Sequence, residues 1–168
     1  RGEFIHFLDA DDLLAADKIE CQMRLLAGPD NHRILCSGAW ARFSDRPDDA
    51  HFSEFVNWRN LTGVEFLQLH FEECVMMHPA AWLAPRPLLD RAGPWDESLT
   101  LNDDGEFFGR VMLRADRIVF SREARSYYRS DLPTSLSRRK DPRSLTSLYR
   151  SFELTIQHLL AAEAGPRT

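Results

Sequence analysis

Near its start the chain reads Phe4-Ile5-His6-Phe7-Leu8-Asp9-Ala10-Asp11-Asp12, a short apolar run that ends in three carboxylates. The run is rich in Phe and Ile, and a helical pattern follows it at once. These features predict a buried strand that carries acidic side chains at its C-terminal end. Because open α/β sheets bind ligands at that end of their strands, the acids form the first candidate site.

The crowding of the acids needs compensation, because two carboxylates about 4 Å apart repel by about 4 kcal/mol at an effective dielectric constant of about 20. Oxygen ligands suit Mg²⁺ or Mn²⁺, and Mg²⁺ usually takes one or two carboxylates together with substrate phosphates. A calcium loop is excluded, because Leu14 stands where such a loop requires Gly. The competing interpretation is a helix N-cap at Asp11 or Asp12, although capping needs only one acid.

The composition is that of a soluble globular protein with one domain. The chain has 168 residues, of which 43% are hydrophobic and 28% charged, and this length suffices for a single core. Its net charge of -5 argues against nonspecific nucleic-acid binding, so nucleic acid is not an expected partner. The three cysteines match no zinc or redox spacing, which indicates reduced thiols and a cytoplasmic protein.

Positive charge is concentrated in the last third of the chain. The cluster can meet phosphates, or it can be an ordinary solvated face, and charge alone does not separate these interpretations. Its members are Arg122, Arg125, Arg129, Arg138, Arg139, Lys140 and Arg143.

Helical and strand patterns alternate along the chain, which predicts an α/β fold. Apolar periodicity and turn residues give the expected elements in order. They are a helix from Leu13 to Leu26, a strand over 33–43, a long loop over 44–60, a helix capped by Thr62, paired edge strands or a bend over 75–83, a helix over 86–92, two strands over 117–121 and 124–129, and an amphipathic helix from Pro142 with apolar positions Leu145, Leu148, Tyr149, Phe152, Ile156, Leu159 and Leu160.

A second acidic concentration, Asn102-Asp103-Asp104-Gly105-Glu106, precedes the apolar positions of another predicted helix. A carboxylate at a helix N-terminus is favoured in its charged form. It stays available as a proton acceptor near neutral pH if burial raises its basicity. A second N-cap is the alternative interpretation.

With both acidic segments in view, the sequence resembles the family 2 glycosyltransferases of the GT-A fold over residues 2 to about 139. The pieces occur in the family's order, and the ordered set is far more specific than a three-residue DXD. They are the strand that ends in Asp9-Ala10-Asp11, the acceptor-site segment Leu89-Asp90-Arg91-Ala92-Gly93-Pro94-Trp95-Asp96-Glu97-Ser98-Leu99, the Glu-Asp motif in Asn102-Asp103-Asp104-Gly105-Glu106-Phe107, and the following strand in Tyr127-Tyr128-Arg129.

The resemblance implies a mixed, Rossmann-like sheet flanked by helices and an inverting transfer of a sugar from a nucleotide diphosphate donor. Asp11 is then the main ligand of Mg²⁺ or Mn²⁺, Asp9 supports the metal or the donor ribose, and Asp104 is the general base. On the same basis Arg129, Arg138 and Arg139 bind donor phosphates. Trp95, Asp103 and His78 contact a glycan or lipid-linked acceptor. Core packing competes for Trp95 and His78, and a solvated turn competes for Arg138 and Arg139.

Two departures from the family pattern shape the remaining expectations. Asp103 stands where the motif has Glu, and the family's N-terminal nucleotide-binding strands have no counterpart here. We therefore expect residues 1–140 to be a partial GT-A domain, 141–168 to be a packing helix and tail, and donor binding to be weak. An unpaired edge of the first strand favours homo-oligomers through strand pairing.

Two other classes of protein stay open at this stage. One is a nucleotidyltransferase, which also combines acidic metal ligands with a Rossmann-like sheet but releases pyrophosphate. The other is a noncatalytic binding module whose acids only cap helices. For the leading hypothesis we expect a cytoplasmic location, with the inner face of the membrane as a possible site of action and bacterial-type glycan synthesis as the setting.

Overall fold

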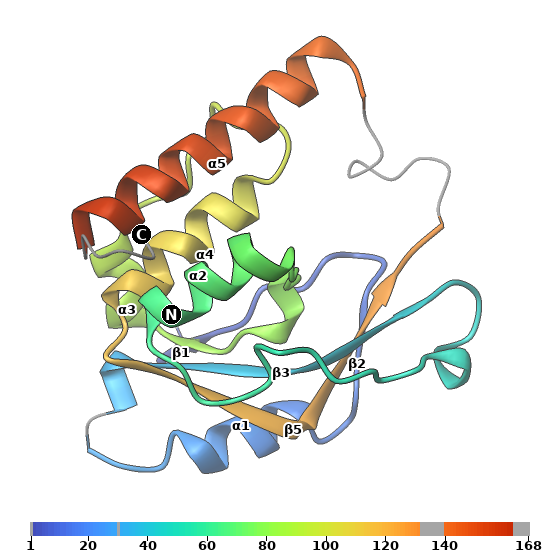
Figure 1. Cartoon of the computed structure of the whole chain (residues 1–168). Coiled ribbons are helices and arrows are strands. Elements are labelled where there is room, and N and C mark those ends of the chain that lie inside the picture. Colours follow the sequence, from blue (N-terminus) through green and yellow to red (C-terminus); the bar gives the residue numbers. More distant parts are fainter. Residues whose placement is uncertain (1, 30, 132–139, 163–168) are drawn as a thin grey trace.

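The structure is a computed structural model, and it describes residues 2–29, 31–131 and 140–162. The strands are β1 (Phe4–Ile5), β2 (Leu13–Leu14), β3 (Ile34–Phe43), β4 (Ala84–Pro85) and β5 (Arg117–Arg129). The α-helices are α1 (Lys18–Leu25), α2 (Gly63–Glu73), α3 (Arg86–Ala92), α4 (Asp103–Arg114) and α5 (Pro142–Ala162). The predicted α/β class is confirmed (Figure 1).

The strands form two sheets, one of two strands and one of three. β5 lies between β3, to which it is parallel, and β2, to which it is antiparallel. β1 and β4 form a separate antiparallel pair, and a bridge between Cys36 and Leu83 connects that pair to β3. β3 is buried at nine of its ten positions, as its continuous apolar pattern indicates.

A bulge interrupts β5 where two separate strands were predicted. Ser121 lies opposite Gly38 and Ser126 lies opposite Trp40, so residues 122–125 of β5 face a single residue of β3. Gly38 is required at this point, because a Cβ there would overlap the carbonyl oxygen of Ala124. The predicted break is real, but the two halves form one bent strand.

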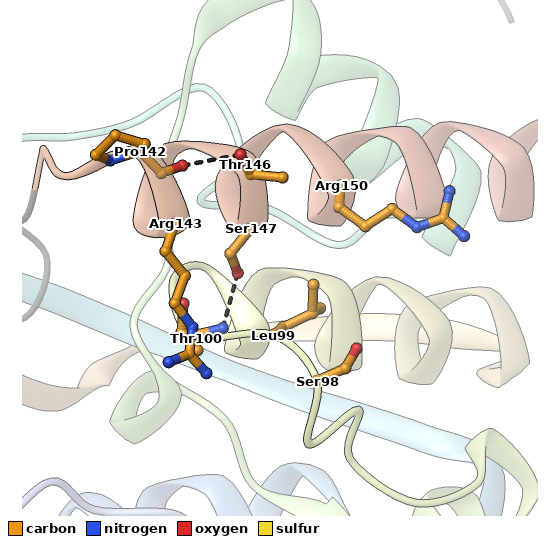
Figure 2. A pocket seen from close by; sticks show the side chains of 8 residues that line it. All are labelled: Ser98, Leu99, Thr100, Pro142, Arg143, Thr146, Ser147 and Arg150. Carbon is orange, nitrogen blue, oxygen red and sulfur yellow. Dashed lines mark hydrogen bonds between the residues drawn. The ribbon is translucent and has the colours of Figure 1, made fainter.

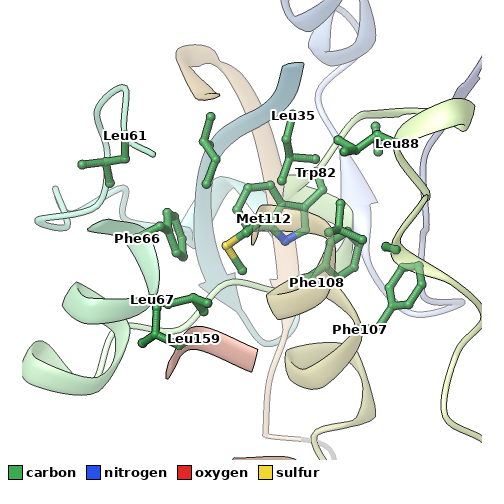
Figure 3. Close-up of a cluster of buried hydrophobic side chains, with 14 residues drawn as sticks. Leu35, Leu61, Phe66, Leu67, Trp82, Leu88, Phe107, Phe108, Met112 and Leu159 are labelled. Carbon is green, nitrogen blue, oxygen red and sulfur yellow. The ribbon is translucent and has the colours of Figure 1, made fainter. Parts of the chain in front are cut away.

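Helices cover both faces of the sheet. α1 lies on one face, and α2, α4 and α5 lie on the other (Figure 1). The main core fills the space between the sheet and the second group of helices, and Figure 3 shows its side chains. It includes Leu35, Phe66, Trp82, Phe108, Val111 and Ile118.

The apolar run that opens the chain is not the buried strand that its composition predicts. β1 has only two residues, and Leu8 is 49% exposed. The backbone at residues 6–12 leaves the sheet and turns, so the acids lie on a turn between β1 and β2.

Several local predictions are confirmed. Thr62 caps α2 through a capping box with Glu65, and α3 covers the predicted residues 86–92. The proline-containing segment before β4 forms a bend with a short 3-10 helix at Pro79–Ala81. The loop over 44–60 holds one 3-10 helix, Pro47–Asp49, among the described residues.

The C-terminal helix forms as predicted, but the face that it buries is not the predicted apolar face. Its buried face is made of small hydroxyl residues and Leu159, while large apolar residues, among them the 70% exposed Tyr149, face outward. Thr155 contacts the helix α4 at Gly109, where only a small residue allows such close packing. The face made of small hydroxyl residues therefore decides how α5 packs. The predicted division of the chain into a partial GT-A domain up to residue 140 and a C-terminal helix and tail stays a prediction.

Candidate active site

Asp9 and Asp11 lie exposed on a turn that the backbone closes with a 3.2 Å bond from the Asp12 amide to the Asp9 carbonyl oxygen. The pKa of Asp9 is raised by partial burial of its carboxyl group first, and then by the charges of Asp12 and Asp11. The turn thus concentrates negative charge at the surface, where a cation can offset it.

Asp12 faces inward, and the prediction that it caps a helix is wrong. α1 begins only at Lys18, after Asp17, so Asp12 is too far from the helix to cap it. Its Oδ1 atom accepts a 2.8 Å hydrogen bond from the backbone N–H of Arg129. Its Oδ2 atom lies 2.9 Å from Nδ1 of His78. The carboxylate therefore ties the acidic turn to the end of β5.

His78 is 1% exposed, and both of its ring nitrogens are occupied. Besides the contact with Asp12, Nε2 lies 2.8 Å from the hydroxyl of the buried Ser126. A ring without a free nitrogen offers nothing to an acceptor, so the geometry favours a buried histidine that positions the acidic turn. The sequence does not indicate that Asp12 and Ser126 are the partners of His78. Ser126 in particular is a small residue within an ordinary strand pattern.

Arg129, expected at the donor phosphates, also holds the turn. Its Nε donates to the carbonyl oxygen of Asp11 at 3.0 Å, and its Nη1 donates to that of Ser44 at 2.6 Å. The guanidinium lies over the ring of Phe43, 4.4 Å from the centroid. Arg138 and Arg139, the other two residues expected there, lie outside the described residues.

The second acidic segment begins α4 and lies near the turn. Asp103 is one of the charges that raise the pKa of Asp9, and Asp9 in turn raises the pKa of Asp104. The pKa of Asp104 is raised to about 6, mainly by burial and then by the charges of Asp103 and Asp9, while its own N–H and that of Gly105 lower it. Asp104 can therefore accept a proton near neutral pH and is more basic than an exposed carboxylate.

Trp95 fixes the orientation of Asp103. Its indole N–H donates to Oδ2 of Asp103 at 2.7 Å. Its ring stacks on Phe107 with centroids 4.1 Å apart and also contacts Phe7, 5.4 Å away. Because Phe7 precedes the acidic turn by two residues, this aromatic cluster holds the two acidic segments side by side.

The residues fit a divalent cation only in part. In the portion of the chain that the structure describes, no three His, Cys, Asp or Glu side chains are placed to hold a metal ion. The exposed carboxylates of Asp9 and Asp11 suit the pattern in which Mg²⁺ takes one or two carboxylates and obtains its other ligands from phosphates and water. The mutual repulsion at the turn is consistent with such a cation.

One observation concerns whether a helix of this chain could cross a membrane. Among the described residues, no helix combines the length and the apolar character that a bilayer crossing requires.

Comparison with solved structures shows a glycosyltransferase-like fold. The chain matches S. aureus TarS, a glycosyltransferase, in complex with UDP-GlcNAc at a TM-score of 0.73 and 18% identity, over 98% of this chain and 45% of that one. It matches TarS in complex with UDP at 0.68 and 16%, over 98% and 43%. A further TarS structure matches at 0.67 and 16%, over 98% and 26%.

The chain thus spans less than half of each of these TarS chains. No protein-family model and no curated protein matches the sequence. At such low identity the likeness shows the fold alone.

Proposed function

We propose that the chain carries the acidic half of a glycosyltransferase site and moves a sugar from a nucleotide diphosphate donor to an acceptor hydroxyl group. The observation that carries this proposal is the meeting of two acidic segments with different environments in a glycosyltransferase-like fold. One is an exposed turn suited to a cation and phosphates, and the other holds Asp104, whose pKa is raised to about 6. The UDP-GlcNAc and UDP complexes of TarS support a nucleotide-sugar donor.

In the proposed reaction Asp104 accepts the proton of the acceptor hydroxyl while the acceptor oxygen attacks the anomeric carbon of the donor. The bond between that carbon and the donor phosphate oxygen breaks, and the nucleoside diphosphate leaves with the electron pair. A single displacement of this kind inverts the anomeric configuration. Trp95 holds Asp103 beside the base, and the negative charge of Asp103 helps to keep Asp104 basic.

Asp9 and Asp11 are the residues that would hold Mg²⁺ or Mn²⁺ together with the donor phosphates. When bound, the ion supplies positive charge that stabilises the departing diphosphate. Asp12, His78 and Arg129 keep the turn in place before the donor arrives, through the contacts described above.

Two substitutions test the proposal, in this chain or in a longer protein that contains it. Asp104→Asn should abolish transfer and leave binding of the nucleotide sugar intact, whereas Asp11→Asn should weaken metal-dependent donor binding. Donor binding is measured by calorimetry with a panel of nucleotide diphosphate sugars and Mn²⁺, and transfer by release of nucleoside diphosphate. Release of pyrophosphate would instead indicate a nucleotidyltransferase, and normal transfer by both variants would refute the assignments.

A further inference from the structure

A cavity of about 380 Å³ lies beside the start of α4, between the loop before that helix and the first turns of α5 (Figure 2). Its lining combines hydroxyl groups with two guanidinium groups and contains no acidic side chain. The lining residues are Ser98, Leu99, Thr100, Pro142, Arg143, Thr146, Ser147 and Arg150. We propose that this cavity binds an anionic group, a phosphate or a carboxylate, of the acceptor, an identification of the ligand that rests on the proposed function.

The first observation is a guanidinium group without a partner, that of Arg143. Arg143 reaches from α5 toward Thr100 (Figure 2), and its guanidinium group makes no hydrogen bond or ion pair with any described residue. Arg150, two helical turns beyond Arg143 on α5, pairs with Glu153 at 2.5 Å. Arg143 therefore leaves its donors available, and guanidinium groups match phosphate and carboxylate oxygens in bidentate geometry.

The second observation is a hydroxyl group without a partner. The Oγ1 atom of Thr100 is buried and has no hydrogen-bond partner among the described residues. A buried hydroxyl group left in this state is energetically costly. Because Thr100 lines the cavity, we expect a rotation about its Cα–Cβ bond to turn this donor toward a bound anion.

The neighbouring acids are engaged elsewhere. Both carboxylate oxygens of Asp141 bond to Ser144, at the start of α5. Asp96 accepts from the N–H and the hydroxyl group of Ser98. Glu153 is paired with Arg150, so none of these three carboxylates is paired with the guanidinium group of Arg143.

The cavity is rigidly linked to the candidate base. The hydroxyl of Ser147 accepts from the N–H groups of Thr100, at 2.7 Å, and Leu101, at 3.0 Å. The side chain of Asn102 donates to the hydroxyl of Ser151 at 2.8 Å. Asp104 follows two residues later, so an acceptor anchored in the cavity is held by the same segment that carries the base.

The direct test is a titration of the chain with inorganic phosphate, followed in amide NMR spectra with EDTA present and the ionic strength held constant with chloride. We expect saturable shifts at Thr100, Leu101 and Arg143. Arg143→Gln should weaken binding roughly tenfold, because charge-assisted hydrogen bonds are lost. The matched control Arg114→Gln, on the exposed end of α4, should bind phosphate like the unaltered chain.

Thr100→Val separates a binding role from a structural one. The substitution removes a hydroxyl group that has no partner, so the melting temperature should stay the same or rise. Phosphate binding should nevertheless weaken by roughly threefold. Dimethyl phosphate and acetate, titrated in parallel, distinguish a phosphodiester from a carboxylate ligand by which of the two binds more tightly.

Amide shifts of the same size in a titration with chloride alone would overturn the proposal of an anion site. An unchanged phosphate affinity in Arg143→Gln would overturn it as well. In transfer assays Arg143→Gln should raise KM for anionic acceptors and leave kcat and the KM of neutral acceptors unchanged. An equal effect on both kinds of acceptor would overturn the link to the acceptor. If no transfer occurs at all, the proposed function fails, and the phosphate titration still decides on the site.

Discussion

The two acidic segments of this protein have similar compositions and opposite environments. The turn that holds Asp9 and Asp11 is exposed, and Arg129 and the buried His78 hold it in place. Asp104 is half-buried in the first turn of α4, where desolvation of its carboxyl group raises its pKa to about 6. The difference indicates that exposure suits a carboxylate to bind a cation and phosphates, while burial suits it to move a proton.

The largest expected effect is the loss of the proton acceptor. Asp104→Asn should reduce kcat by about 10²–10⁴-fold, the range typical of a lost general base. Donor affinity by calorimetry should stay unchanged. Asp11→Asn is the matched substitution on the turn, and it should reduce donor affinity in the presence of Mn²⁺. If the two variants showed the same phenotype, the division of roles between the segments would be wrong.

The support beneath the turn is expected to have the next largest effect, and it acts on stability. Asp12→Ala leaves the N–H of Arg129 and the ring of His78 buried without their partner, which should cost about 2–4 kcal/mol. Asp12→Asn keeps the size of the side chain and one oxygen atom that can accept a hydrogen bond, and it should lower the free energy of unfolding by about 1 kcal/mol or less. Urea denaturation measures both values. Equal values for the two variants would show that the hydrogen bonds of Asp12 contribute little.

Burial of Asp104 should also be visible in the pH dependence of stability. Its folded pKa of about 6 lies above the ordinary 3.8, so the native state binds the proton more tightly than the unfolded chain. The contribution of this group to stability is therefore present below pH 4 and is lost as the pH rises through 6. Asp104→Asn should raise the melting temperature at pH 7 and have little effect at pH 4, a pattern that calorimetric scans can check.

Asp103 tests the coupling between the segments through the pH profile of transfer. Below pH 6 Asp104 becomes protonated, so kcat/KM should fall with a midpoint near 6. Asp103→Asn removes a neighbouring negative charge and should lower that midpoint. The Asn oxygen can still accept from Trp95, so the orientation is retained. An unchanged midpoint would mean that burial alone sets the basicity.

The smallest expected effect is at the aromatic cluster. Trp95→Phe keeps an aromatic ring against Phe107 but removes the N–H that holds Asp103. One lost hydrogen bond corresponds to about 1 kcal/mol. We expect kcat/KM to fall by a few fold and donor affinity to stay the same. A loss as large as that of Asp104→Asn would indicate that Trp95 contacts the acceptor directly.

The elements that could be predicted are those with local signals. The capping box at Thr62, the continuous apolar pattern of β3 and the acidic start of α4 each depend on nearby residues, and each is confirmed. Asp104 could be proposed as a base for the same reason, because its place in the first turn of α4 is local information.

The predictions that failed depend on contacts between distant residues. Asp12 resembles a helix cap in sequence, yet its partners are His78 and Arg129, 66 and 117 positions away. The buried face of α5 could not be found from hydrophobicity, because close packing at Gly109 selects the small Thr155 rather than the large apolar residues. In the sequence Arg143 is only one of several basic residues, because the cavity that it lines is formed by two segments far apart in the chain.

The bulge in β5 separates the length of this segment from the register of the residues that follow it. Side chains alternate between the two faces of a strand, so a shift of β5 by one residue against β3 after the bulge would turn Ser126 away from His78 and move Arg129 off the turn. Residues 122–125 lie outside the ladder, and their number can change without such a shift. In proteins that share this architecture, we therefore expect insertions and deletions in β5 to fall within this segment wherever the acidic turn is retained.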